Sequence, residues 1–138
     1  MKKCIVCLDG SPPSWRALDR ALSEAADGAD VLAVTAVEAL TFFDCAPNAC
    51  DATFTAIMQE PKKILAAAED AARQRGLTLR TLAEPGRPAE TVARIARQEA
   101  ADEIIVGSRG KDEVQHLLVG SVSARLVQIA PCTVVVVR

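Results

Sequence analysis

The residues best suited to chemistry in this sequence are glycines and serines around a predicted phosphate-binding turn. The apolar run Ile104–Val106 ends in Gly107, and a second glycine, Gly110, follows three residues later. After a nine-residue spacer, Gly120 and a serine open a predicted helix. Glycines let a backbone approach a ligand closely, and the N–H groups at a helix N-terminus attract anions. The pattern therefore predicts a site for a phosphate chain.

A phosphate site makes specific demands on these residues. We expect Gly107 and Gly110 to adopt positive φ angles, which glycine reaches without strain. We expect Gly120 and Ser121 to present unpaired N–H groups, and the Ser121 and Ser123 hydroxyls to donate to phosphate oxygens. The alternative interpretation is that the glycines only shape tight turns and a helix start, with no ligand.

Two better-known nucleotide motifs do not occur in the sequence. It contains no G-x-x-x-x-G-K-[ST] string, so the predicted site is not a P-loop. A dinucleotide G-x-G-x-x-G fingerprint would follow the first strand, and none does. Because there is neither a P-loop lysine nor an obvious general base, we expect any hydrolysis of a bound nucleotide to be slow.

Five short apolar runs alternate with helical patterns along the chain. Several runs are continuous and rich in β-branched residues, which is typical of strands buried on both faces of a parallel sheet. The alternation predicts a single α/β domain over residues 1–138, a three-layer α/β/α sandwich with right-handed crossovers. The expected strands are Lys3–Leu8, Asp30–Val37, Thr78–Ala83, Glu103–Val106 and Cys132–Val137.

The helices expected between these strands carry recognisable end signals. Asp9 or Ser11 is expected to cap the first helix, and Gly76 to close the second. One irregular stretch, Ala39–Glu60, is too long for an ordinary connection and is predicted to be a lid or mobile flap. The later helices are expected at Pro61–Arg75, Pro88–Ala100 and Ser121–Ile129.

The composition excludes several classes of function. With a net charge of −2 and 3% aromatic residues, the chain lacks the basic patch and the stacking platform of a nucleic-acid binder. No apolar run approaches the roughly 20 residues that a membrane span needs, and the first apolar stretch is too short for a signal peptide. We therefore expect a cytoplasmic protein that binds neither nucleic acid nor membrane.

The cysteines and the single histidine are candidate reactive groups. Cys4 and Cys7 have C-x-x-C spacing but lie within a predicted strand, so we interpret them as buried small hydrophobic residues. Cys45 and Cys50 flank a loop and could pair if oxidised, but cytosolic conditions disfavour a disulfide. His116 is interpreted as a solvated loop residue, and zinc is not expected because no histidine accompanies the cysteines.

The glycine and serine spacing resembles the nucleotide-binding signature of the universal stress protein family. The likeness extends over essentially the whole chain, including Asp9-Gly10-Ser11 after the first strand, the Gly86-Arg87-Pro88 turn and the closing run Val134–Val137. It implies a Rossmann-like fold of the adenine nucleotide alpha hydrolase type, with a five-stranded parallel sheet of order 3-2-1-4-5. With the full glycine spacing intact, the chain resembles the ATP-binding branch of the family.

The resemblance implies a role for each matching position. Asp9 would face the ribose or a Mg²⁺ ion on the phosphates, the alternative being a helix cap. Backbone groups of Ala36 would contact the adenine edge, at a position where the family usually has Val, and Arg109 in the loop could reach a phosphate. The expected ligand-binding residues are Asp9, Gly10, Ser11, Ala36, Val37, Gly107, Ser108, Arg109, Gly110, Gly120, Ser121, Val122 and Ser123.

These observations favour a stress-response regulator or sensor that binds ATP, or AMP or ADP, with little turnover. A slow ATPase or nucleotidyl-transfer enzyme is one alternative, and a nucleotide-free interaction module is the other. Under the implied sheet order, Cys132–Val137 is an apolar edge strand that a second copy would cover. We therefore expect a homodimer through the C-terminal strand, and a further protein partner could respond to the bound nucleotide.

Overall fold

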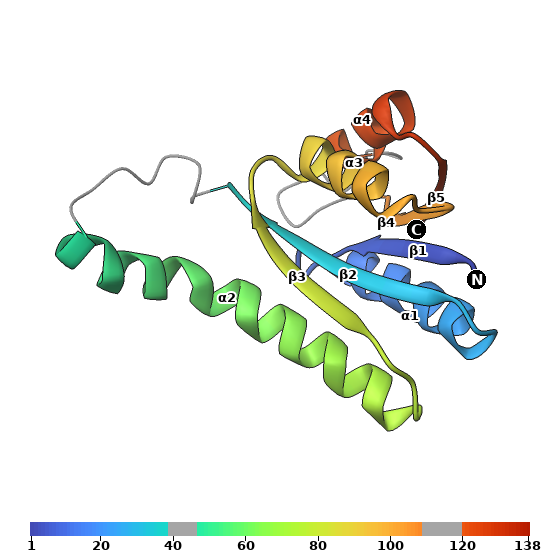
Figure 1. Ribbon diagram of the computed structural model, residues 1–138, viewed down its shortest axis with the longest axis horizontal. Coiled ribbons are helices and arrows are strands. Elements are labelled where there is room, and N and C mark those ends of the chain that lie inside the picture. Colours follow the sequence, from blue (N-terminus) through green and yellow to red (C-terminus); the bar gives the residue numbers. More distant parts are fainter. Residues whose placement is uncertain (39–46, 109–119) are drawn as a thin grey trace.

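The computed structural model of the chain describes residues 1–38, 47–108 and 120–138. Its centre is a five-stranded parallel sheet of order β3-β2-β1-β4-β5, which confirms the predicted fold (Figure 1). The strands are β1 (Lys3–Cys7), β2 (Asp30–Val37), β3 (Arg80–Pro85), β4 (Glu103–Gly107) and β5 (Thr133–Val137). The helices are α1 (Pro12–Ala26), α2 (Pro47–Gln74), α3 (Pro88–Glu99) and α4 (Ser121–Ile129).

Two helices cover each face of the sheet. On one face, α1 and α2 contribute Leu22 and Ala68 to a buried cluster that includes Val6 of β1. On the other face, α3 and α4 contribute Val92 and Leu126 to a second cluster. Because side chains alternate along a strand, each strand supplies both clusters, which explains the continuous apolar runs in the sequence.

The strand register brings the carboxyl ends of β1, β2 and β4 together. Ile5 of the central strand β1 lies opposite Leu32 of β2 and opposite Ile104 of β4. The pairing with β2 continues one residue beyond β1, where the Leu8 N–H donates to the Val34 carbonyl at 2.9 Å. The segments that follow these strands therefore meet at one edge of the sheet.

The turn from β1 into α1 is closed by local hydrogen bonds. Ser11 is the N-cap of α1, and its hydroxyl accepts from the Ser14 N–H at 3.3 Å. The Ser14 hydroxyl donates in return to the Ser11 carbonyl at 2.8 Å. Pro12 and Pro13 occupy the first turn, where a missing N–H removes no intrahelical bond. Ser11 rather than Asp9 is therefore the capping residue.

The second helix is longer than the sequence predicted. α2 begins at Pro47, so the expectation of an irregular flap is wrong for residues 47–60, while residues 39–46 lie outside the described part of the chain. Pro61 suggested a helix start because proline rarely occurs inside a helix. It lies inside α2, where it is buried. Packing of α2 against the core outweighs the local preference of this proline.

Smaller differences occur at other element ends. β3 begins at Arg80 and is displaced by two residues from the expected Thr78–Ala83. α3 ends at Glu99 and is followed by Ala100 in the left-handed region, with φ 53°. None of the helices in the described part of the chain has the length and apolarity needed to cross a bilayer.

Candidate functional site

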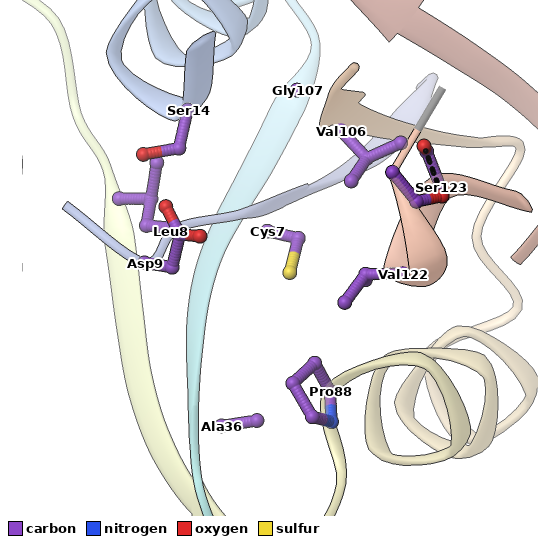
Figure 2. A pocket seen from close by; sticks show the side chains of 11 residues that line it. Cys7, Leu8, Asp9, Ser14, Ala36, Pro88, Val106, Gly107, Val122 and Ser123 are labelled. Carbon is purple, nitrogen blue, oxygen red and sulfur yellow. Dashed lines mark hydrogen bonds between the residues drawn. The ribbon is translucent and has the colours of Figure 1, made fainter. Parts of the chain in front are cut away.

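A pocket opens where the carboxyl ends of β1, β2 and β4 meet the starts of α3 and α4 (Figure 2). This is the crevice beside the point where the strand order reverses, and open α/β sheets bind ligands at that point. The described residues that line it are Cys7, Leu8, Asp9, Ser14, Ala36, Pro88, Val106, Gly107, Gly120, Val122 and Ser123. Among the predicted site residues, it brings together Asp9, Ala36, Gly107, Gly120, Val122 and Ser123.

One side of the pocket is an apolar wall. Figure 2 shows the side chains of Cys7, Ala36, Pro88 and Val122 around the same space, and they come from β1, β2, α3 and α4 respectively. Small apolar side chains in this arrangement leave room for a flat ring and offer it little polar contact. Selectivity for a base would then depend on backbone N–H and carbonyl groups at the strand ends.

The Cys7 thiol belongs to this wall. Burial raises the pKa of the Cys7 thiol to about 12, with a further contribution from the negative charge of Asp9. The thiol is therefore protonated at neutral pH and is a poor nucleophile. This agrees with the interpretation of Cys7 as a buried small hydrophobic residue.

Asp9 supplies a carboxylate at the pocket, directly after β1. Its Oδ1 atom accepts from the Ser11 N–H at 2.9 Å, across a turn in which Gly10 has φ +86°. That φ lies in the left-handed region, so glycine is required at this position. The described residues contain no group of three or more His, Cys, Asp or Glu side chains that could hold a metal. Asp9 alone fits a Mg²⁺ ion whose remaining ligands are phosphate oxygens and water.

Gly107 is a glycine for a reason different from the predicted one. It is the last residue of β4, pairs with Val137, and is not among the residues with positive φ. A Cβ atom at this position would lie 2.8 Å from the Pro13 carbonyl carbon and 2.9 Å from the Ser14 nitrogen. The missing side chain therefore allows the start of α1 to contact the end of β4.

The start of α4 is held by hydrogen bonds within the protein. The Gly120 N–H donates to the Ser108 carbonyl. The Ser123 hydroxyl lies 3.1 Å from both the Ser108 and the Gly120 carbonyl oxygens. The expectations of an unpaired Gly120 N–H and of a Ser123 hydroxyl free for phosphate are therefore wrong. The first-turn N–H group of Val122 and the dipole of α4 remain the features of this helix that favour an anion.

The other predicted residues are not among those that line the pocket. Gly10 and Ser11 shape the turn that follows Asp9, and the Val37 carbonyl accepts from the Gly86 N–H at 3.3 Å. Ser108 is buried and joins β4 to β5 and α4 through its backbone, and Ser121 is exposed. The predictions for Arg109, Gly110, His116 and the Cys45–Cys50 pair lie outside the described residues.

Sequence reasoning missed several residues that line the pocket. Cys7 and Leu8 directly precede Asp9, and Pro88 opens α3 just after β3. The rule that ligands bind beyond the carboxyl ends of strands was a signal for all three. Ser14 had no such signal, because its place in the pocket depends on the contact between α1 and β4.

Fold and pocket together define an α/β protein with a ligand site at the switch point of its sheet. The model of the universal stress protein family matches residues 1–138. The chain is 31% identical over 145 residues to the universal stress protein YxiE of Bacillus subtilis, and the match covers 99% of this chain and 98% of that protein. The chain belongs to the universal stress protein family.

Two further relatives agree with this assignment. A universal stress protein of Thermus aquaticus is 35% identical over 141 residues, covering 99% of this chain and 98% of that protein. The structure of a universal stress protein in complex with cAMP is similar with a TM-score of 0.76 and 27% identity. That match covers 99% of this chain and 97% of the other.

Proposed function

We propose that this chain is a nucleotide-binding universal stress protein that holds ATP, AMP or ADP and acts as a stress-response sensor with little turnover. One observation carries the proposal: the apolar wall, the Asp9 carboxylate and the start of α4 all line the same pocket. A similar protein, 27% identical over nearly the whole chain, was solved with cAMP, which supports an adenine nucleotide as the ligand.

The parts of the pocket suit the parts of a nucleotide. The base would lie against Cys7, Pro88 and Val122, with its edge at the backbone of Ala36. The ribose hydroxyls would donate to Asp9, because an ionised carboxylate only accepts hydrogen bonds. The phosphates would lie at the first turn of α4, where N–H groups and the helix dipole favour anions.

A Mg²⁺ ion would add charge neutralisation at the phosphates. Asp9 would hold it as the alternative to the ribose contact, because Mg²⁺ commonly takes one or two carboxylates together with substrate phosphates. Binding of the nucleotide should then depend on Mg²⁺ more strongly for ATP than for AMP.

Little turnover is expected from the ionisable groups at the site. Among the described lining residues there is no lysine, arginine or histidine to stabilise a transferred phosphoryl group. The Cys7 thiol is protonated, and the Asp9 carboxylate is engaged with the Ser11 N–H. Phosphate release from ATP that is faster than one event per minute and is lost in Asp9→Asn would contradict the sensor and favour the slow enzyme.

The experiment that tests the proposal is a calorimetric titration of ATP and AMP into protein stripped of carried-over nucleotide. Ala36→Leu adds bulk to the apolar wall and should weaken binding at least tenfold. Ala124→Leu makes the same change at an exposed position of α4 and should leave the affinity unchanged. If the unmodified protein binds neither nucleotide, the glycines only shape turns, and the interaction module becomes the better description.

We also propose that two copies pair through β5. This strand lies at an edge of the sheet, and its residues from Val134 to Val137 are only half-buried. Val127 on the adjacent α4 leaves 62% of its surface exposed. An apolar edge strand is prone to pairing, and a second copy related by a two-fold axis would cover it. A monomeric mass by light scattering at micromolar concentration would contradict the dimer.

A further inference from the structure

Exposure divides α2 into two segments. In its second half, Ile64 and Leu65 are buried in the core at 8% and 9% exposure. In its first half, residues 52–56 are all exposed and Phe54 leaves 46% of its surface accessible, whereas Met58 is buried at 9% exposure. Figure 1 shows these first turns extending beyond the ends of the strands. We refer to residues 52–56 as the α2 arm.

Pro61 lies about one turn beyond the arm, in the part of the helix that packs on the core. A proline has no N–H group, so the Ile57 carbonyl cannot receive its usual bond from the residue four positions later. Met58 and Pro61 are both buried, so the helix is held on the core from Met58 onward. Interior prolines are common points of helix bending, so the turn from Ile57 to Pro61 is the place where the arm can bend.

Ile64, one turn after Pro61, contacts the turn that carries Asp9. A Cβ atom at Gly10 would lie 3.2 Å from Ile64 Cδ1 and 3.5 Å from Ile64 Cγ1, so the Ile64 side chain occupies the space directly beside Gly10. Gly10 stands between Asp9, which lines the pocket, and Ser11, which caps α1. A ligand that binds the Asp9 carboxylate therefore contacts a turn against which α2 packs.

Strand β2 provides a second connection between the pocket and α2. Thr35 faces the layer of α2, because Val31 and Ala33 on the same strand pack in the cluster that contains Ile64. Its neighbour Ala36 lines the pocket on the other face (Figure 2). Thr35 is 4% exposed, and its hydroxyl has no hydrogen-bond partner among the described residues. A ligand that contacts Ala36 therefore acts on a strand whose other face packs against α2.

We propose that filling the pocket repositions the α2 arm about Pro61, and that the Gly10–Ile64 contact transmits the change. The inference rests on the proposed nucleotide binding and adds its mode of regulation. The arm is the part of the surface that differs between the empty and the occupied protein. A binding partner would therefore distinguish the two states by contacting the arm.

The test is hydrogen–deuterium exchange of the full chain with and without saturating AMP, combined with a titration of AMP into each variant. In the unmodified protein, exchange in peptides covering residues 52–56 should change at least threefold when AMP binds. Peptides from the packed half of α2 should change less. Pro61→Ala restores the missing N–H, so the arm should exchange more slowly and lose its response while AMP affinity stays within about twofold.

Two buried neighbours in α2 provide a matched pair. Ile64→Ala removes the contact with Gly10, whereas Leu65→Ala removes a side chain of the same volume and burial that has no atom within 4 Å of the place where a Gly10 Cβ would lie. Loss of the response in Ile64→Ala alone, with AMP still bound, is the expected result. An equal loss in both variants, or AMP binding without any change in the arm, would overturn the coupling. If AMP does not bind the unmodified protein, the proposed function fails and this inference fails with it.

Discussion

At the end of β4 there is no room for a side chain on Gly107, so a substitution there tests the contact between β4 and the start of α1. Gly107→Ala would place a methyl group less than 3 Å from the Pro13 and Ser14 backbones, so α1 must move away. We expect the free energy of unfolding to fall by about 1–3 kcal/mol, as for other overpacked sites. Urea denaturation measures this loss. A variant as stable as the original would show that the start of α1 can withdraw from β4 without cost.

The buried Cys7 thiol makes stability depend on alkaline pH. Its pKa rises from an ordinary value of 9.0 to about 12 in the folded state. Below pH 9 the thiol is protonated in both states, so its contribution to stability is complete. Between pH 9 and 12 the unfolded chain ionises while the folded one does not, so stability falls as the pH rises. At pH 10 the loss from this group should be about 1.4 kcal/mol.

Urea denaturation at pH 8 and pH 10, for the unmodified protein and for Cys7→Ala, isolates this contribution. Lysines and the Cys4 thiol, whose pKa is also raised by burial, titrate in both proteins and cancel in the comparison. The variant should lose less stability between the two pH values. Equal losses would mean that Cys7 is accessible to solvent in the folded state.

Single residues at the site were only partly predictable from the sequence. Asp9, Ala36 and Val122 could be placed because their positions at strand and helix ends follow from the element pattern and the family resemblance. The reason for Gly107 and the internal bonds of Ser123 could not be predicted. Both depend on which backbone from elsewhere in the chain comes within about 3 Å, and no local pattern encodes that distance.

At the level of elements, the contact between β2 and α2 contains a polar group that weakens it. Thr35→Val replaces a hydroxyl that has no partner in the described part of the chain with a methyl group of similar size. We expect the free energy of unfolding to rise by about 1 kcal/mol, because a buried hydroxyl without a partner retains its desolvation cost. Thr81→Val is the control, since the Thr81 hydroxyl donates to Glu69 Oε1 at 2.7 Å and should give no gain. Thermal denaturation distinguishes the two, and a destabilised Thr35→Val would contradict the assignment.

The strands were easier to predict than α2. A run such as Ile104–Val106 indicates a doubly buried strand by its composition alone, and all three residues are buried. The first turns of α2 contain Asn48, Asp51 and Thr53, which have modest helix propensity, and Pro61 then resembles a helix start. The helix continues through this proline because its second half is packed on the sheet, and such tertiary stabilisation is not visible in a short window of sequence.

For the whole molecule, the proposed pairing through β5 predicts how stability responds to protein concentration. A dimer that dissociates on unfolding has a Tm that rises with concentration, whereas a monomer does not. We expect the Tm to increase by several degrees between 1 and 100 μM protein, because mass action over this range stabilises the folded dimer by roughly one to two kcal/mol. Differential scanning calorimetry over this range gives the answer, and a constant Tm would exclude a dimer that dissociates on unfolding.

The central position of β1 has a consequence for synthesis on the ribosome. β1 emerges before the other four strands and can pair with β2 within about thirty residues, but its other partner, β4, lies about a hundred residues further on, with Cys4 opposite Glu103. A nascent chain can therefore assemble β1, β2 and β3 under α1 and α2 while the other edge of β1 remains open. Contacts of such long sequence separation slow folding. During that interval the exposed edge of β1 is the site at which a chaperone would protect the chain and at which two unfinished chains would join.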